Sequence, residues 1–252
     1  MSTGVLIAVA ALWGAVAGAL LPRAAYRFSA PMGEAWRDTC PRRHAISGGI
    51  GGWLGGWIGP ARCGECAPTE TRYGSRTPVT AASTALVCAA LAAATGTRPE
   101  LGVWLLLAPV GVLLTLVDFR VQRLPDPLTL PLAGAALALL GAVAFVPEHA
   151  GDWLTALYGA LALGGGFFLL FLINPGGMGF GDVKLALSLG AVLGWYGWAT
   201  VMLGTFAAFL FGGLYGGALV VGRRAGRKTA IAFGPFLIAG AFVGLLIGAY
   251  AA

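Results

Sequence analysis

Residues 174–185 read N-P-G-G-M-G-F-G-D-V-K-L and lie at the junction of two apolar runs, residues 153–173 and 183–195. The stretch holds four glycines, a proline, Asp182 and Lys184. A charged side chain costs about 2.5–3.5 kcal/mol at the centre of a membrane helix, so an acid in this setting indicates a functional site. Glycines give a backbone that can adopt positive φ and that lets a second chain come close. The stretch therefore predicts a peptide-binding segment that presents Asp182.

The composition of the 252-residue chain is that of a membrane protein, because 58% of its residues are hydrophobic and only 10% are charged. Soluble domains carry about 25% charged residues. Several apolar runs approach the roughly 20 residues that cross a bilayer. The sequence predicts an all-α, polytopic membrane helix bundle of about eight transmembrane helices, with a first span that is retained because no basic residue precedes it. The eight runs are residues 4–21, 79–95, 101–117, 128–146, 153–173, 183–195, 199–221 and 230–251.

The basic residues orient the predicted bundle. If the N-terminus lies outside, every Lys and Arg except Arg98 falls on the cytoplasmic side, in residues 23–76, 120–123, 184 and 223–228. The net charge of +6 is then explained by topology and by contact with anionic lipid headgroups, and we expect no nucleic-acid partner. Under this topology, two acids from different helices, Asp118 and Asp182, lie at a similar depth at the cytoplasmic face.

A polar connection, residues 23–78, separates the first transmembrane helix, residues 1–22, from a transmembrane core, residues 79–252. Its C-G-E-C stretch has the spacing of half a zinc site, with a third cysteine upstream and a histidine close to where a fourth would stand. A degenerate site or redox-labile thiols are the alternatives, and a stable disulfide is the least expected in a cytoplasmic loop. The candidate ligands are Cys40, His44, Cys63 and Cys66.

Residues 116–132 read L-V-D-F-R-V-Q-R-L-P-D-P-L-T-L-P-L and contain two acids of different character. Asp126 stands directly before a proline, which is typical of a helix N-cap, and we interpret it as structural. Asp118 ends an apolar helix, where the macrodipole disfavours an anion by about 0.3–1 kcal/mol. Either Asp118 is a solvated carboxylate paired with Arg120 or Arg123, or it has a functional role.

A pair of acids at one depth predicts hydrolysis by general acid–base catalysis. Like charges a few ångströms apart do not both ionise readily, so one carboxylate activates water while the other donates a proton. Asp182 at a helix start is favoured in its charged form, although an N-cap role is its simpler explanation. The chain has no G-x-S-x-G or H-E-x-x-H stretch, and its two histidines, His44 and His149, fall on opposite sides of the membrane.

The acidic motifs resemble those of the type IV prepilin peptidases, which are membrane aspartic proteases. The segment from Gly179 to Asp182, followed by Lys184, is similar to the G-x-G-D motif of that family. Asp118 followed by L-P-D at residues 124–126 is similar to its first aspartate motif. The F-G-P-F stretch at residues 233–236 and the C-G-E-C loop also match segments of the family.

The resemblance implies an endopeptidase of the bacterial inner membrane that cleaves the short basic leader from prepilin or pseudopilin precursors at the cytoplasmic face. It implies that Asp118 and Asp182 are catalytic. It also implies a substrate-positioning loop, formed by Gly179, Gly181, Lys184, Pro125 and Asp126.

Many members of the family also methylate the new N-terminus with S-adenosylmethionine. This chain departs from the family in the half linked to methylation: residues 18–27 lack the asparagine of the family pattern, and Arg43 replaces a cysteine. We therefore expect proteolysis that requires no cofactor, zinc as an option in the cysteine loop, and S-adenosylmethionine only if methyl transfer is retained. A proton- or cation-coupled transporter and a scaffold that binds pilin helices without cleaving them are the alternative functions.

Overall fold

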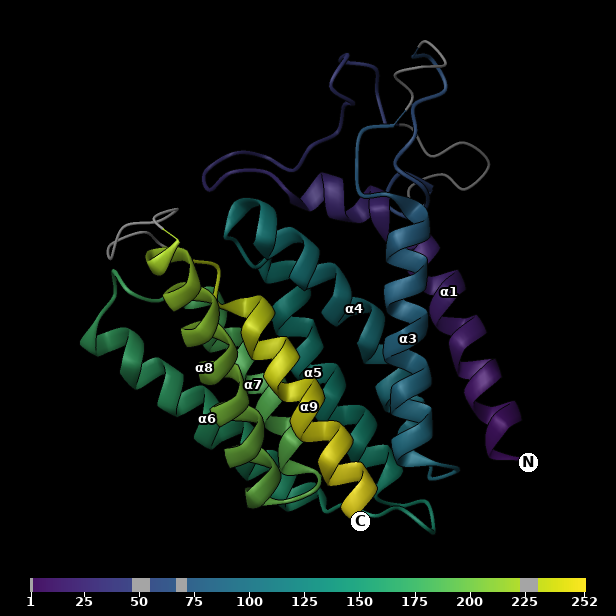
Figure 1. Ribbon diagram of the computed structural model, residues 1–252, viewed down its shortest axis with the longest axis vertical. Coiled ribbons are helices and arrows are strands. Elements are labelled where there is room, and N and C mark those ends of the chain that lie inside the picture. The colour runs from purple at the N-terminus through teal and green to yellow at the C-terminus, as the bar shows by residue number, and fades with distance from the viewer. Residues whose placement is uncertain (1, 47–54, 67–71, 223–230) are drawn as a thin grey trace. The chain divides into compact units, whose positions relative to one another are not determined.

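The computed structural model describes residues 2–46, 55–66, 72–222 and 231–252, and within these ranges it is all-helical, with no strand (Figure 1). Each predicted apolar run overlaps one helix, which confirms the fold class. Seven of the helices, all but α7, are long and apolar enough to cross a membrane, so this is a multi-pass membrane protein. The helices are α1 (Thr3–Phe28), α3 (Thr77–Thr95), α4 (Glu100–Val121), α5 (Asp126–Val143), α6 (Trp153–Ile173), α7 (Phe180–Gly194), α8 (Trp198–Val221) and α9 (Gly234–Ala251).

The chain divides into two compact units. Unit 1 comprises residues 1–93 and 104–123, and unit 2 comprises residues 94–103 and 124–252. In unit 1, α1 runs on to Phe28, so the helix includes residues that the sequence assigned to the polar loop. The basic residues predicted for the last cytoplasmic connection, 223–228, lie outside the described residues.

In unit 1, α1 packs closely on α3 and also bonds to α4. A Cβ atom at Gly18 would lie 2.5 Å from the carbonyl oxygen of Thr80, so only glycine allows this approach. The indole Nε1 of Trp13 donates to the carbonyl oxygen of Leu105 at 2.8 Å. That carbonyl stands four residues before Pro109, which has no N–H to offer it. Trp13 thus supplies the hydrogen bond that the proline removes from α4.

In unit 2, α7 is the central helix and packs against α5, α6, α8 and α9 (Figure 1). Ten of its 15 residues are buried, which fits its position inside the group. Glycines bring α6 and α7 into backbone contact: a Cβ atom at Gly159 would lie 2.5 Å from the carbonyl oxygen of Gly190. Close approach through small residues is the usual packing device of membrane helices.

Candidate active site and metal centre

Asp118 lies in the last turn of α4, as predicted, and is only 4% exposed. The helix ends just beyond it, where Gln122 adopts a φ of 49° and its N–H donates to the Asp118 carbonyl at 2.8 Å. Arg120 donates to the Ser75 hydroxyl at 2.8 Å, and Arg123 donates to the Pro31 carbonyl at 3.0 Å. Burial contradicts the alternative that Asp118 is a solvated surface carboxylate.

Asp182 lies in the first turn of α7 and is 7% exposed. The N-cap of this helix is Gly179, and the Asp182 N–H donates to the Gly179 carbonyl at 3.0 Å. The N-cap explanation of Asp182 is therefore wrong, because the residue stands three positions inside the cap. Asp118 belongs to unit 1 and Asp182 to unit 2, and the pairing of the two carboxylates stays a prediction.

An ion pair joins the first residue of α5 to the fifth residue of α7 within unit 2. The Nζ atom of Lys184 lies 2.7 Å from Oδ1 of Asp126, with 16% of the lysine side chain and 62% of the aspartate side chain exposed. The N-cap of α5 is Pro125, so the prediction that Asp126 caps this helix is wrong. Its carboxylate pairs with Lys184 instead. Sequence reasoning missed the partnership because 58 residues separate the two charges.

Among the glycines before Asp182, Gly181 matters because it has no side chain and so permits close packing, and not because of an unusual backbone angle. Gly33, Gly59, Gly96 and Gly197 are the described glycines with positive φ, so residues 176–181 do not use the freedom to adopt it. Gly181 is required by a close approach, since a Cβ atom there would lie 2.9 Å from Cβ of Leu124. The start of α7 thus rests directly on the residue that precedes Pro125 and Asp126.

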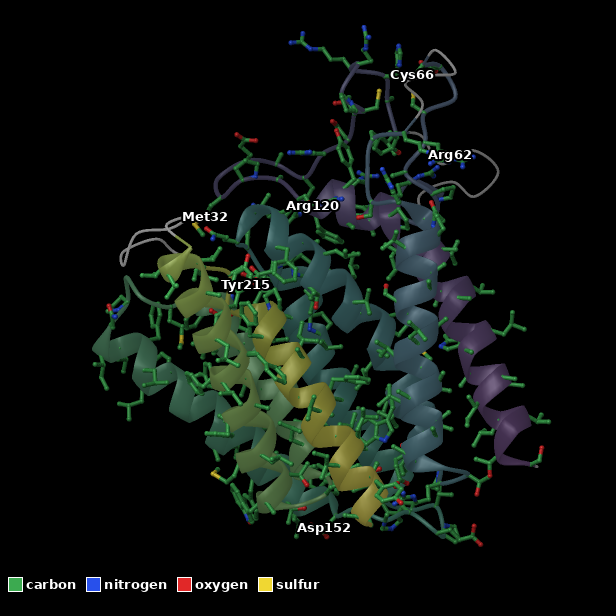
Figure 2. The ribbon with its side chains drawn as sticks, viewed as in Figure 1. Met32, Arg62, Cys66, Arg120, Asp152 and Tyr215 are labelled. Atoms are coloured by element: carbon green, nitrogen blue, oxygen red, sulfur yellow. The ribbon has the colours of Figure 1, made fainter. Side chains whose placement is uncertain are left out.

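The four predicted metal ligands do come together, in the loop that carries Cys66 and Arg62 (Figure 2). Their ligand atoms all lie within 4.8 Å of one another. Two backbone bridges hold the ligand-bearing loops: Thr39 pairs with Ala45, and Arg62 pairs with Arg72. Within the first loop the Cys40 N–H donates to the His44 carbonyl at 2.9 Å.

The distances in this cluster fit a tetrahedral zinc ion. The sulfur atoms of Cys40 and Cys66 are 3.8 Å apart, and Nδ1 of His44 lies 3.7, 3.5 and 3.4 Å from the sulfurs of Cys40, Cys63 and Cys66. Zinc bonds of about 2.3 Å to sulfur and 2.0–2.1 Å to nitrogen would require edges of about 3.8 and 3.5 Å. His44 therefore fills, through Nδ1, the position that Arg43 cannot.

The thiols of the cluster differ in acidity. Burial raises the pKa of the Cys40 thiol, but backbone hydrogen bonds from His44 and Arg42 and bonds to the other two thiols outweigh it, and the pKa falls to about 7. Burial and the neighbouring thiols raise the pKa of Cys66 to about 12. Because the thiolate is the form that binds a metal, Cys40 reaches its binding form at a lower pH than Cys66 does.

Aromatic and arginine side chains fasten this loop to α1. The rings of Tyr26 and Tyr73 meet edge to face with their centroids 4.6 Å apart. The guanidinium of Arg27 lies 3.9 Å from the centroid of the Trp57 ring and donates to the carbonyl of Gly56 at 2.8 Å. The metal cluster is thereby held on the same unit that contains Asp118.

The known proteins that this chain resembles are leader peptidases. The profile of a family described as the type IV leader peptidase family matches residues 105–217. The prepilin leader peptidase/N-methyltransferase of Pseudomonas aeruginosa is 33% identical over 193 residues, which cover 73% of this chain and 63% of the relative. The protein of the same name from Aeromonas hydrophila is 36% identical over 198 residues, which cover 74% and 62%.

A shorter relative is covered more fully. The leader peptidase HopD of Salmonella typhimurium is 37% identical over 142 residues, which cover 54% of this chain and 86% of HopD. The chain spans less than two thirds of the length of the Pseudomonas and Aeromonas relatives. No solved structure matches it.

Proposed function

Because the chain belongs to the type IV leader peptidase family, we propose that it is an aspartic endopeptidase that cleaves the basic leader from prepilin or pseudopilin precursors. It acts at the cytoplasmic face of the bacterial inner membrane, with Asp118 and Asp182 as its catalytic pair. The observation that carries the proposal is the burial of both acids, 4% and 7% exposed, at helix ends of a multi-pass bundle. A carboxyl group in such a place needs a reason beyond solubility.

The length of α7 supports a site below the membrane surface. Its 15 residues extend about 22 Å, less than the hydrocarbon thickness of about 30 Å. Phe180 contacts Phe168 and Phe171 of α6, with ring centroids 6.5 and 5.3 Å apart, so α7 begins before α6 has ended. The first residue of α7 therefore packs beside the last two turns of α6.

In the proposed reaction one carboxylate removes a proton from water, and the water oxygen bonds to the scissile carbonyl carbon. The second acid, protonated, stabilises the oxygen that becomes negative. The carbon–nitrogen bond then breaks, and the proton passes to the leaving amine. Asp182 in the first turn of α7 is the base, because the helix N-terminus favours its charged form.

Lys184 and Asp126 hold the segment that presents Asp182. Their 2.7 Å ion pair ties α7 to the start of α5, and the contact of Gly181 with Leu124 fixes the same two elements one turn earlier. Together with Gly179 and Pro125, the two helix caps, they form the positioning loop of the proposed site.

Zinc is proposed as a structural ion of the cysteine loop, held by Cys40, His44, Cys63 and Cys66. Four protein ligands close the coordination sphere, which is the pattern of structural zinc sites and not of catalytic ones. The ion would therefore stabilise the loop and take no part in peptide cleavage. Methyl transfer from S-adenosylmethionine is left out of the proposal, because residues 18–27 lack the asparagine of the family pattern.

The test is cleavage of a co-expressed prepilin by variants of both acids. Asp118→Asn and Asp182→Asn should each accumulate uncleaved precursor at normal enzyme levels. Asp152→Asn is the matched control: this acid caps α6, accepting from the Thr155 N–H at 2.8 Å, and its loss should leave cleavage intact. Full processing by both catalytic-site variants would exclude the pair. Binding of the precursor by the intact protein without any cleavage would favour the scaffold alternative.

A further inference from the structure

An ion pair between the half-buried Arg98 and the buried Glu100 lies at the α3–α4 connection and has no part in the proposed chemistry. Glu100 is the first residue of α4 and is 0% exposed, although it carries a carboxylate. The guanidinium Nε of Arg98 lies 3.9 Å from its Oε1. Both residues belong to unit 2.

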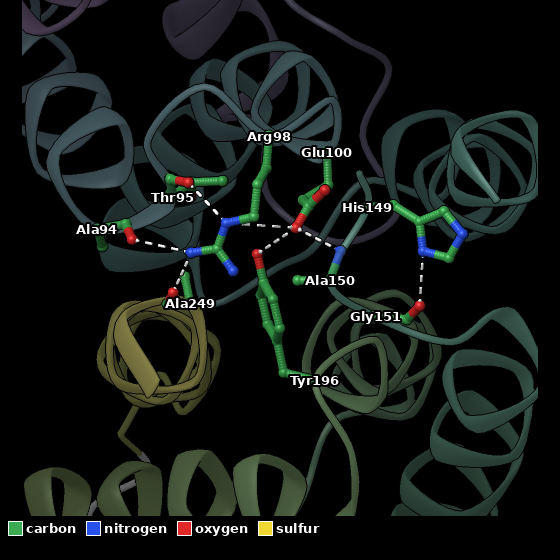
Figure 3. A network of polar contacts seen from close by, with 9 residues as sticks. All are labelled: Ala94, Thr95, Arg98, Glu100, His149, Ala150, Gly151, Tyr196 and Ala249. Carbon is green, nitrogen blue, oxygen red and sulfur yellow. Dashed lines mark hydrogen bonds and ion pairs between the residues drawn. The ribbon is translucent and has the colours of Figure 1, made fainter. Parts of the chain in front are cut away.

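Glu100 joins three separate segments of unit 2. Its Oε1 accepts from the Ala150 N–H at 3.3 Å and from the Tyr196 hydroxyl at 3.2 Å (Figure 3). Ala150 precedes α6, and Tyr196 lies in the turn between α7 and α8. The carboxylate therefore fixes the end of α7 that is remote from Asp182. About 21 Å of helix separates the two positions.

Arg98 donates hydrogen bonds to the C-terminal ends of two further helices, α3 and α9. Its Nε donates to the Thr95 carbonyl at 2.8 Å, and its Nη2 donates to the carbonyls of Ala94, at 3.3 Å, and of Ala249 (Figure 3). Ala94 and Thr95 end α3, and Ala249 lies in the last turn of α9. Carbonyls in the last turn of a helix lack intrahelical partners, and a cation there is also favoured by the macrodipole. One guanidinium thus satisfies the ends of α3 and α9 together.

Stability alone does not explain a charged pair at this place. Removing two charges from water is costly, and buried ion pairs replaced by well-packed apolar residues often leave stability equal or higher. An apolar pair could not form the directional hydrogen bonds that fix the Tyr196 hydroxyl and the Ala249 carbonyl. The five segments that meet at this pair would then keep their packing contacts but lose the directional bonds that set their register.

We propose that Arg98 and Glu100 are positioning residues that set the axial position of α7 and α9, and through the rigid α7 the position of Asp182. The kinetic part of this inference rests on the proposed leader peptidase activity, whereas its structural part does not. A misplacement of about 1 Å far from the chemistry is enough to cost about 100-fold in rate.

The test is the double variant Arg98→Met/Glu100→Met in the full-length protein. We expect an unfolding temperature close to that of the wild type, since the apolar pair packs without a charge penalty. Hydrogen exchange should rise about tenfold or more at Ala150, whose N–H loses its acceptor, and at residues 194–198 and 247–252, because the Tyr196 hydroxyl and the Ala249 carbonyl lose the partners that hold these helix ends closed. For prepilin cleavage, kcat should fall about tenfold or more while KM changes less than about twofold.

Tyr196→Phe separates positioning from folding, because it removes one hydroxyl and leaves the ion pair. It should speed exchange at residues 194–198 but not at 247–252, and it should lower kcat. Wild-type exchange and wild-type kcat in Tyr196→Phe would overturn the inference, whether or not the double variant folds. If the wild-type protein cleaves no precursor, the proposed function fails, while the exchange pattern still decides the structural part.

Discussion

Replacement of Gly190 by alanine tests the packing that holds α7 in place. A Cβ atom at this position would lie 2.8 Å from the carbonyl carbon of Gly159 and 2.9 Å from Cα of Ala160. Carbon atoms pack best at about 3.5–4.0 Å, so α6 and α7 would have to separate by about 1 Å. Both contacted atoms are backbone atoms, which cannot move without their helix. Such overpacking costs about 1–3 kcal/mol.

The assay is thermal unfolding of the purified protein, with prepilin cleavage measured on the same samples. At about 2–4 °C for each kcal/mol, the loss corresponds to a fall of about 2–12 °C. At an assay temperature where the variant is still folded, the cleavage rate should already be reduced, because α7 carries Asp182. Gly190→Ala is expected to give folded protein with a displaced site.

Gly165→Ala is the matched control on the facing helix α6. No atom lies within 4 Å of a Cβ atom at Gly165, and the residue is exposed. Alanine in a helix interior is favoured over glycine by about 1 kcal/mol, so this variant should be as stable as the wild type or more stable. The packing argument fails if Gly190→Ala unfolds no lower than the wild type, or if both variants lose equal stability.

Three further substitutions test separate features. Lys184→Met should reduce leader cleavage and should lower the free energy of unfolding by about 1 kcal/mol or less, because the ion pair is partly exposed. The charge swap Asp126→Lys/Lys184→Asp should restore cleavage, and a swap that cleaves no better than Lys184→Met would argue against a positioning pair. Cys63→Ser should abolish the one zinc per chain measured by elemental analysis, whereas Cys88→Ser, buried in α3, should keep it; an unchanged zinc content in Cys63→Ser would exclude the proposed ligand set. Trp13→Phe leaves a carbonyl of α4 without its donor and should lower stability by about 0.5–1.5 kcal/mol, measured by unfolding, and equal stability would show that the bond contributes nothing.

The apolar runs were sufficient to predict the helices, because hydrophobicity over roughly 20 residues is a local property. The shortest predicted run, residues 183–195, corresponds to α7, which is the shortest described helix and packs against four others. The cysteine spacing and a nearby histidine were likewise enough to predict the metal cluster. His44 was identified because its distance along the chain from Cys40 is short.

The roles of Asp126 and Lys184 were not predictable in the same way. An acid before a proline matches the rule for an N-cap, and that local rule prevailed over a partner 58 residues away. The sequence left open whether the glycines of residues 176–181 serve positive φ or close approach, since it shows the conformational freedom of a glycine but not the neighbour that requires it. The neighbour of Gly181 is Leu124, which only the fold brings near.

Arg98 shows how an exception to a sequence rule can mark a structural site. It is the one basic residue that the predicted topology leaves outside the cytoplasmic side. The positive-inside rule describes basic residues that contact lipid headgroups and water. Arg98 instead pairs with Glu100 and donates to carbonyls at the ends of α3 and α9. Glu100, at 0% exposure, gave no signal of its own, but it stands two residues from the exception. An isolated arginine on the predicted side that carries few basic residues, with an acid close to it in sequence, therefore indicates an ion pair within the protein.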